Sequence, residues 1–78
     1  LLFNDVHNNF YQKLKSEFPE LTPHELKICG LLRLNLTSKD IADITARTPR
    51  TINNTRSSIR TKLGLDSNNN LIDFLMQF

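Results

Sequence analysis

The sequence predicts an all-α domain, and three observations lead to this expectation. Threonines at helix-start positions recur at Thr22, Thr37 and Thr48, so short helices joined by tight turns are expected. No segment alternates apolar and polar residues with the period of two that marks a strand. A chain of 78 residues forms one small domain. Such a domain buries only about 60% of the surface that its unfolded chain exposes, so a partner could add to its stability.

The first predicted helix covers roughly residues 3–16 and precedes Pro19. One face of it carries an apolar stripe at helical spacing: Phe3, Val6, Phe10 and Leu14. The stripe either packs on the rest of the domain or belongs to a coiled-coil or linker helix that pairs with a second chain, and it is too short for heptads to decide. We expect residues 1–20 to form a linker helix and residues 21–78 to form the folded domain.

The second and third helices begin at capping boxes. In TPHE at residues 22–25, threonine caps the helix, proline takes the first helical position and glutamate reaches back to the cap. TSKD at residues 37–40 repeats the pattern with the shorter aspartate. Asn35 is expected to end the second helix in the left-handed conformation.

The fourth helix is expected to span residues 49–63, because Thr48 and Pro49 give its start and Gly64 its stop. A last helix, LIDFLMQF, follows, and Asp66 or Ser67 can cap it, although three asparagines make a poor first turn. Its apolar stripe predicts a dimer contact, unless the stripe packs within the chain: Leu71, Phe74, Leu75 and Phe78.

The basic excess of the chain lies on the fourth helix. Residues 48–65 hold four cations and no acids, residues 1–47 hold six of each, and residues 66–78 hold two acids, which gives a net charge of +2. The second helix of a helix-turn-helix that carries such a surplus is the electrostatic footprint of a protein that binds duplex DNA.

The fourth helix also separates an apolar face from a polar one. At about 100° per residue, Ile52, Ile59 and Leu63 face the core. The opposite face carries polar side chains: Arg50, Asn53, Asn54, Ser57 and Thr61. Arg60 and Lys62 lie on the two flanks, so a helix in a major groove would offer short polar groups to the bases and a cation to each phosphate wall. Outside a helix-turn-helix, a solvated charged face would explain this pattern.

Three motifs occur in order along the chain: LTPHE at residues 21–25, TSKDIA at 37–42, and TI at 51–52 with KLGL at 62–65. In this combination they resemble the LuxR/GerE-type four-helix DNA-binding domain, and the resemblance covers residues 21 to about 76 without an insertion. The segments FYQKLKSEFPELT and LLRLNLTSKDIA look like the subgroup at the C-terminus of large bacterial regulators, behind a sensor or tetratricopeptide-repeat region.

The resemblance implies a mechanism of DNA recognition. In the family, the helix here spanning residues 49–63 enters the major groove and the last helix forms the dimer contact. Matching positions imply base contacts by Asn53, Asn54 and Ser57. They imply contacts to the DNA backbone by five residues: Arg50, Thr51, Ser58, Arg60 and Lys62. The implied partners are double-stranded promoter DNA, a second copy of the chain and, as a further contact, RNA polymerase. No cofactor is implied.

The paired asparagines suggest which base is read. An asparagine amide can donate to N7 and accept from N6 of adenine, a match worth roughly 1–3 kcal/mol against a wrong base. We therefore expect Asn53, Asn54 or both to specify an A·T pair in each half-site. Water-mediated or phosphate contact is the alternative.

The chain departs from the family at positions where aliphatic residues are usual and Thr45, Arg47 and Arg56 occur, and at Asn53, where lysine is common. Fewer groove-facing cations should weaken nonspecific binding. Arg56 falls within the core stripe, so a structural ion pair is expected, with phosphate contact as the alternative. Three carboxylates are candidate partners: Glu25, Asp40 and Asp43.

The sequence gives no support for an enzyme, a metal site or a membrane span. No nucleophile–base pair, carboxylate dyad or glycine-rich loop occurs, and His24 and Cys29 fall on different helical faces. Cys29 is expected to be a small buried hydrophobe, and a lone cysteine excludes an internal disulfide. The chain opens on Leu1 without a signal peptide, so we expect a piece of a longer regulator. This domain is expected to be cytoplasmic, while the full-length protein could be membrane-anchored.

Two other functions remain open at this stage. A promoter-reading domain of a sigma factor also has LRxxLxxxDIA-like wording before a helix-turn-helix, but Gly64 and the apolar last helix favour the first interpretation. A helical protein-interaction module that has lost DNA binding would explain Asn53 in place of lysine and the polar Thr45 and Arg47.

Overall fold

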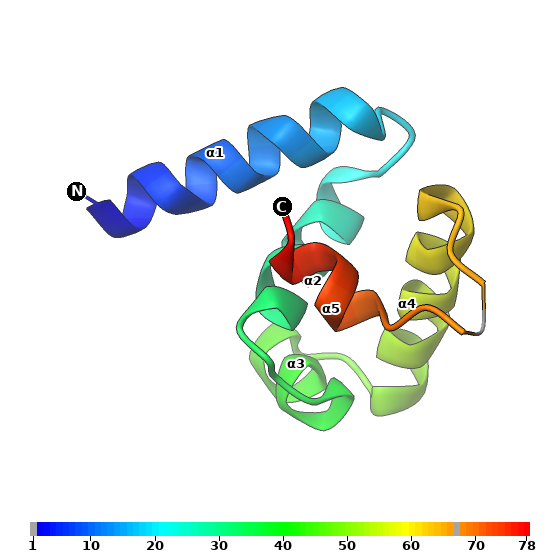
Figure 1. Cartoon of the computed structure of the whole chain (residues 1–78). Coiled ribbons are helices and arrows are strands. Elements are labelled where there is room, and N and C mark those ends of the chain that lie inside the picture. Colours follow the sequence, from blue (N-terminus) through cyan, green and yellow to red (C-terminus); the bar gives the residue numbers. More distant parts are fainter. Residues whose placement is uncertain (1, 67) are drawn as a thin grey trace.

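The computed structural model describes residues 2–66 and 68–78, with side chains from residue 9 onward. Within these ranges it contains five α-helices and no strand: α1 Leu2–Glu17, α2 Pro23–Arg33, α3 Ser38–Thr45, α4 Pro49–Leu63 and α5 Leu71–Met76. The helices α2 to α5 cluster together, and the longer α1 lies across one end of the group (Figure 1). The predicted all-α fold, four helices with an additional N-terminal helix, is confirmed.

Both predicted capping boxes are present. At the start of α2, Thr22 Oγ1 accepts from the Glu25 N–H at 3.1 Å and Glu25 Oε1 accepts from the Thr22 N–H at 2.9 Å. At the start of α3, Thr37 and Asp40 make the same reciprocal pair at 3.1 and 3.2 Å. Thr48 caps α4 through the Thr51 N–H at 3.2 Å. These bonds satisfy backbone donors that a helix start leaves without intrahelical partners.

Residues with left-handed backbone conformation follow α2, α3 and α4. Asn35, with φ of 64°, follows α2, and Gly64, with φ of 73°, ends α4, as the sequence predicts. Ala46, with φ of 56°, ends α3, and the following Arg47 N–H donates to Ala42 O at 2.9 Å. Alanine is disfavoured in this region, so nothing in the sequence marks Ala46 as the end of α3.

The predicted core face of α4 is confirmed, because Ile52 and Ile59 are fully buried and Leu63 is nearly so. They pack with buried residues of α2 and α3, among which Ile28, Leu32 and Ile41 are the largest aliphatic side chains. The helices α3 and α4 pack against each other, and Ser38 at the start of α3 bonds to Asn53 in the N-terminal half of α4. The opposite face of α4 is left toward solvent.

The helix α1 packs on the domain through Phe10 and Leu14, which are buried. The Phe10 ring meets the Phe78 ring edge to face, with centroids 6.5 Å apart, and the Arg33 guanidinium lies over Phe10 at 4.7 Å. Aromatic and cation–π contacts of this kind stabilise a small core beyond their buried area. For these side chains the packing alternative holds; those of Phe3 and Val6 lie outside the described residues.

The last helix begins one residue after Asn70, whose side chain accepts from the Asp73 N–H at 3.1 Å. The expected cap by Asp66 is therefore wrong, and Ser67 lies outside the described residues. Asp66 accepts from the Asn68 N–H at 2.8 Å and so forms a turn within the loop. Asp66 lies five residues before Leu71, the first residue of α5, and its short side chain cannot reach the first turn, whereas Asn70 directly before the helix can.

The apolar stripe of α5 packs within the chain. Leu71 and Leu75 are buried, at 2% and 0% exposure. The partly buried Phe74 and Phe78 each meet the ring of Phe18, at 6.1 and 6.2 Å between centroids. The intramolecular alternative therefore describes this stripe, while a dimer contact on α5 stays a prediction that would use the surface left exposed.

Replacing Ala46 with Gly should stabilise the domain by up to about 1 kcal/mol, because glycine adopts the left-handed region without the clash that alanine suffers there. The free energy of unfolding, measured by urea denaturation, checks this. Gly64→Ala is the matched control at another left-handed helix end and should destabilise by a similar amount. A loss of stability in Ala46→Gly would contradict the assigned backbone conformation.

Candidate nucleic-acid interface

The outward face of α4 presents the polar residues that the sequence predicts. Five of them are exposed: Arg50, Asn53, Asn54, Ser57 and Thr61. Thr51 is half-buried, and its hydroxyl lies 3.0 Å from that of Thr48, so it belongs to the helix cap. The exposed side chains are densest in the N-terminal half of α4, the half that a recognition helix uses to reach base edges.

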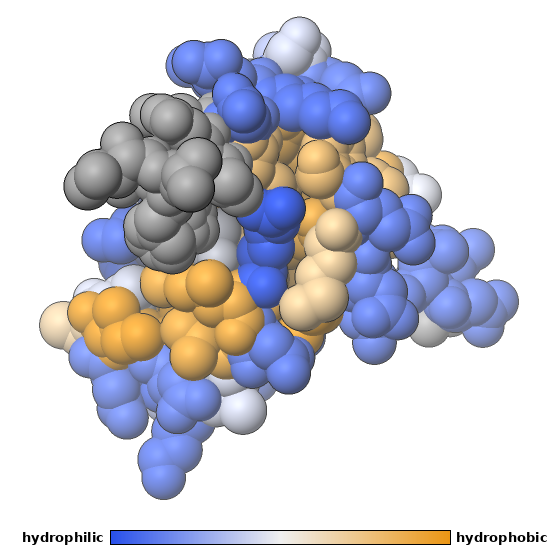
Figure 2. Space-filling model, turned by 60° about the vertical axis from the view of Figure 1, so that its left-hand side comes forward, coloured by the Kyte–Doolittle hydropathy of each residue, from blue (hydrophilic) through white to orange (hydrophobic). Residues whose placement is uncertain are grey.

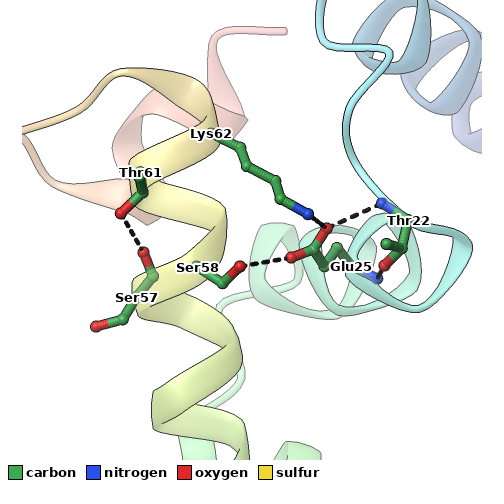
Figure 3. Close-up of polar contacts among 6 residues, drawn as sticks. All are labelled: Thr22, Glu25, Ser57, Ser58, Thr61 and Lys62. Carbon is green, nitrogen blue, oxygen red and sulfur yellow. Dashed lines mark hydrogen bonds and ion pairs between the residues drawn. The ribbon is translucent and has the colours of Figure 1, made fainter.

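A buried carboxylate holds the C-terminal half of α4 against α2. Glu25 is only 6% exposed. Its Oε1 accepts from Lys62 Nζ at 2.7 Å, and its Oε2 accepts from Ser58 Oγ at 2.8 Å. Figure 3 shows that Ser58 and Lys62 point toward Glu25, while Ser57 and Thr61 lie on another side of the same helix. Two of the five predicted backbone-contacting residues, Ser58 and Lys62, are therefore bonded to Glu25.

The charge of Glu25 is stabilised by these donors. Burial alone would raise the pKa of its carboxyl, but hydrogen bonds from Lys62, the Thr22 N–H and Ser58, with the positive charge of Lys62, lower that pKa to about 2. Glu25 is therefore ionised at neutral pH. A buried carboxylate with this many donors stabilises the contact between α2 and α4. Removal of one partner would leave the buried charge uncompensated and lower the free energy of unfolding.

Arg60 lies on the other flank of α4, where its Nη2 donates to the carbonyl oxygen of Asp66. Arg60 and Arg56 line an open polar groove of about 660 Å³ between α4 and the loop that carries Asn68 and Asn69. Arg60 is half-buried, and its hydrogen bond to Asp66 holds its guanidinium against the loop. The groove adjoins Ser57, one of the exposed residues on the outward face of α4.

The ion pair expected for Arg56 is wrong. Arg56 Nη1 donates to Ser38 Oγ at 3.0 Å, whereas Glu25 pairs with Lys62 and Asp40 accepts from the Thr37 N–H. Arg56 is only half-buried, so water still solvates its charge and a neutral acceptor suffices. The third candidate partner, Asp43, is exposed.

Sequence reasoning missed Ser38, which lies at the first position of α3. Ser38 Oγ donates to Asn53 Oδ1 at 2.8 Å and so touches a residue assigned to base contact. Fifteen positions separate the two residues, and only the packing of α3 on α4 brings them together. Lys39 and Arg47 are two further exposed cations of α3 and the turn. Lys39 lies in α3 and Arg47 lies between α3 and α4. This placement next to α4 is the only feature of the sequence that could have indicated a functional role for them.

Residues 19–75 match the family of bacterial regulatory proteins, luxR family, described as GerE. The chain belongs to the luxR family. The matched range includes α2, α3 and α4 and nearly all of α5, so the polar face of α4 lies within it. Neither the curated proteins nor the solved structures gave a match. Membership in the luxR family implies a helix-turn-helix that binds DNA and regulates transcription.

Cys29 carries no site chemistry. Cys29 is fully buried, as predicted, and burial, together with the charge of Glu25, raises the pKa of its thiol to about 12, so it is an inert core residue. Among residues 2–66 and 68–78, no group of three or more metal-binding side chains occurs. In the same ranges, no helix has the length and apolarity needed to cross a membrane.

The Glu25 network should make stability fall in acid. Because the folded pKa of Glu25 is depressed, its contribution is fully present above the unfolded value near 4.5 and is lost as pH falls toward 2. Replacing Glu25 with Gln should cost about 3 kcal/mol at neutral pH and flatten the acid dependence. Urea unfolding at a series of pH values measures both effects.

The exposed Glu20 supplies the matched control. Glu20→Gln removes one carboxylate of the same type without touching Lys62 or Ser58, and it should leave neutral-pH stability within about 0.5 kcal/mol of the unaltered chain. Equal behaviour of the two variants would contradict the assigned role of Glu25.

Proposed function

We propose that this chain binds double-stranded promoter DNA in a sequence-specific manner as the output domain of a bacterial transcription regulator, with α4 in the major groove. The observation that carries the proposal is the exposed polar face in the N-terminal half of α4, on a helix-turn-helix of the luxR family. The major groove presents a distinct pattern of donors and acceptors for each base pair, and an α-helix of this polarity can read it.

Base contacts are proposed for Asn53, Asn54 and Ser57, because all three are exposed on this face. Contacts to the DNA backbone are proposed for Arg50 and for the start of α4 around Thr51. Arg60, Ser58 and Lys62 keep this assignment only as secondary contacts, because a phosphate must compete with their bonds inside the chain. Lys39 and Arg47 are exposed cations that can contact phosphates in place of these three bonded residues.

The proposed assembly is a homodimer on DNA, with residues 1–20 as a linker helix in a longer cytoplasmic regulator of the sensor or tetratricopeptide-repeat subgroup that could contact RNA polymerase. Met76 of α5 is 49% exposed, unlike the buried Leu71 and Leu75, and it offers apolar surface for a second copy. Figure 2 shows that apolar side chains gather on one face of the molecule between hydrophilic regions. A sigma-factor-like domain and an interaction module without DNA binding remain the alternatives.

Replacing Arg50 with Ala should weaken binding to all DNA sequences alike. It should also reduce the slope of log K against log salt concentration by about 0.9 per protomer, because one phosphate contact is lost. Fluorescence anisotropy with a selected operator and a scrambled duplex, over a range of salt concentrations, measures both quantities.

The control is Lys15→Ala, which removes an exposed cation of α1 and should leave the slope unchanged. An unchanged slope in Arg50→Ala removes this residue from the backbone-contact role. A flat salt response by the unaltered chain would instead favour the protein-interaction module.

Replacing Met76 with Glu should reduce dimer formation on DNA about tenfold or more, because a two-fold contact on α5 would bring the two new carboxylates together. Analytical ultracentrifugation with operator duplexes measures the assembly. Leu34→Glu is the matched control, since Leu34 is 50% exposed at the end of α2 and undergoes the same apolar-to-acid change. Dimers that persist in the Met76 variant would place the contact elsewhere, with α1 the next candidate.

A further inference from the structure

Three side chains from two helices form a chain of hydrogen bonds beside the exposed polar face of α4. Arg56 Nη1 donates to Ser38 Oγ at 3.0 Å, and Ser38 Oγ donates to Asn53 Oδ1 at 2.8 Å. Asn53 and Arg56 are three residues apart on α4 and so lie on neighbouring positions of one face. Ser38, at the start of α3, bridges the two.

The direction of these bonds follows from the chemistry of the groups. A guanidinium has donors only, so Ser38 must accept from Arg56, and its own hydrogen remains for Asn53. A hydroxyl that accepts from a cation is polarised and donates more strongly. The Asn53 oxygen is therefore the atom held toward α3. Because the amide is planar, this fixes the orientation of the amino group as well.

The hydrogen bond from Ser38 affects which base the Asn53 amide can recognise. Asn53 is exposed, and the hydrogen bond to Ser38 uses one of the two acceptor positions of its oxygen and turns that oxygen toward α3. Recognition of adenine requires both amide atoms, because the oxygen accepts from N6 while the nitrogen donates to N7. Guanine presents two acceptors, N7 and O6, on the same edge and so requires donors alone. An amide whose oxygen is held by Ser38 is suited to the second pattern.

We propose that Ser38 is a positioning residue that holds the Asn53 oxygen toward α3, so that the Asn53 amino group selects guanine over adenine at one position in each half-site. The inference rests on the proposed DNA binding and deepens it by naming the base. Asn54, the next residue, is also exposed, and no hydrogen bond of its side chain occurs within the described part of the chain. The adjacent asparagines therefore differ, because Ser38 turns the amide oxygen of Asn53 toward α3, whereas the Asn54 amide can present both its oxygen and its amino group to adenine.

The first experiment tests the contact without DNA. In the 78-residue chain, NMR resonances of the Asn53 side-chain amide are compared between the unaltered protein, Ser38→Ala and Ser38→Thr. Loss of the hydroxyl in Ser38→Ala should shift both amide hydrogens, whereas Ser38→Thr, which keeps a hydroxyl, should leave them close to their original positions. The Asn54 amide is the internal control and should move in neither variant. Unchanged Asn53 resonances in Ser38→Ala would overturn the contact.

The second experiment reads base preference. Operators are selected from random DNA with the unaltered chain, and guanine and adenine are then exchanged at each half-site position. We expect one position with about a tenfold preference for guanine that Asn53→Ala abolishes, a size within the range of specific base contacts. Ser38→Ala should reduce that preference or reverse it toward adenine, and Ser38→Thr should retain it. Thermal unfolding of each variant verifies that the helix-turn-helix is intact.

The outcomes separate this inference from the proposed function. If the unaltered chain binds no duplex DNA, the proposed function fails and the inference fails with it. If the chain binds specifically but the Asn53 position prefers adenine, or keeps its guanine preference in Ser38→Ala, only the positioning role of Ser38 is overturned. A uniform loss of affinity in Ser38→Ala at every sequence, with the preference unchanged, would likewise reduce Ser38 to a structural residue.

Discussion

The buried carboxylate of Glu25 fixes how α4 lies on the rest of the domain. Ser58 and Lys62 are one helical turn apart on α4, and both bond to this one group. A rotation of α4 by one residue, about 100°, would withdraw both donors and leave a charge without partners in the interior. The same carboxylate closes the capping box of α2 through the Thr22 N–H. The start of α2 and the rotation of α4 are therefore determined together, and the rotation decides which side chains face outward.

In this arrangement the two halves of α4 differ in how far their side chains are bonded to other parts of the chain. Toward its C-terminus, Lys62 and Arg60 are bonded to other parts of the chain, and Ile59 and Leu63 are buried. Toward its N-terminus, the side chains on the outer face meet solvent. A count of cations along the helix therefore overstates the charge that is free for phosphates. Specific contacts from short polar groups gain importance relative to electrostatic attraction as that free charge declines.

The helix α1 and the last helix supply the core with aromatic surface that the helix-turn-helix lacks. Phe10 and Phe18 contribute from the N-terminal side, and Phe74 and Phe78 from α5. A domain of this size buries little of its surface, so each large side chain that closes the core has a substantial effect on stability. Most of the apolar stripe of α5 is buried in contacts within the chain. Its spacing alone could not distinguish a partner within the chain from a second copy.

The sequence by itself determined the local interactions of the chain. Helix starts at Thr22, Thr37 and Thr48 and the stops at Asn35 and Gly64 depend on residues within a few positions of one another, and the core face of α4 follows from helical periodicity. Tertiary structure decided the rest. It replaced the expected carboxylate partner of Arg56 with Ser38 and turned Lys62 inward, and it engaged the amide oxygen of Asn53. These contacts join residues 15 to 37 positions apart, so they exist only once helices have packed, and no periodicity or cap encodes them.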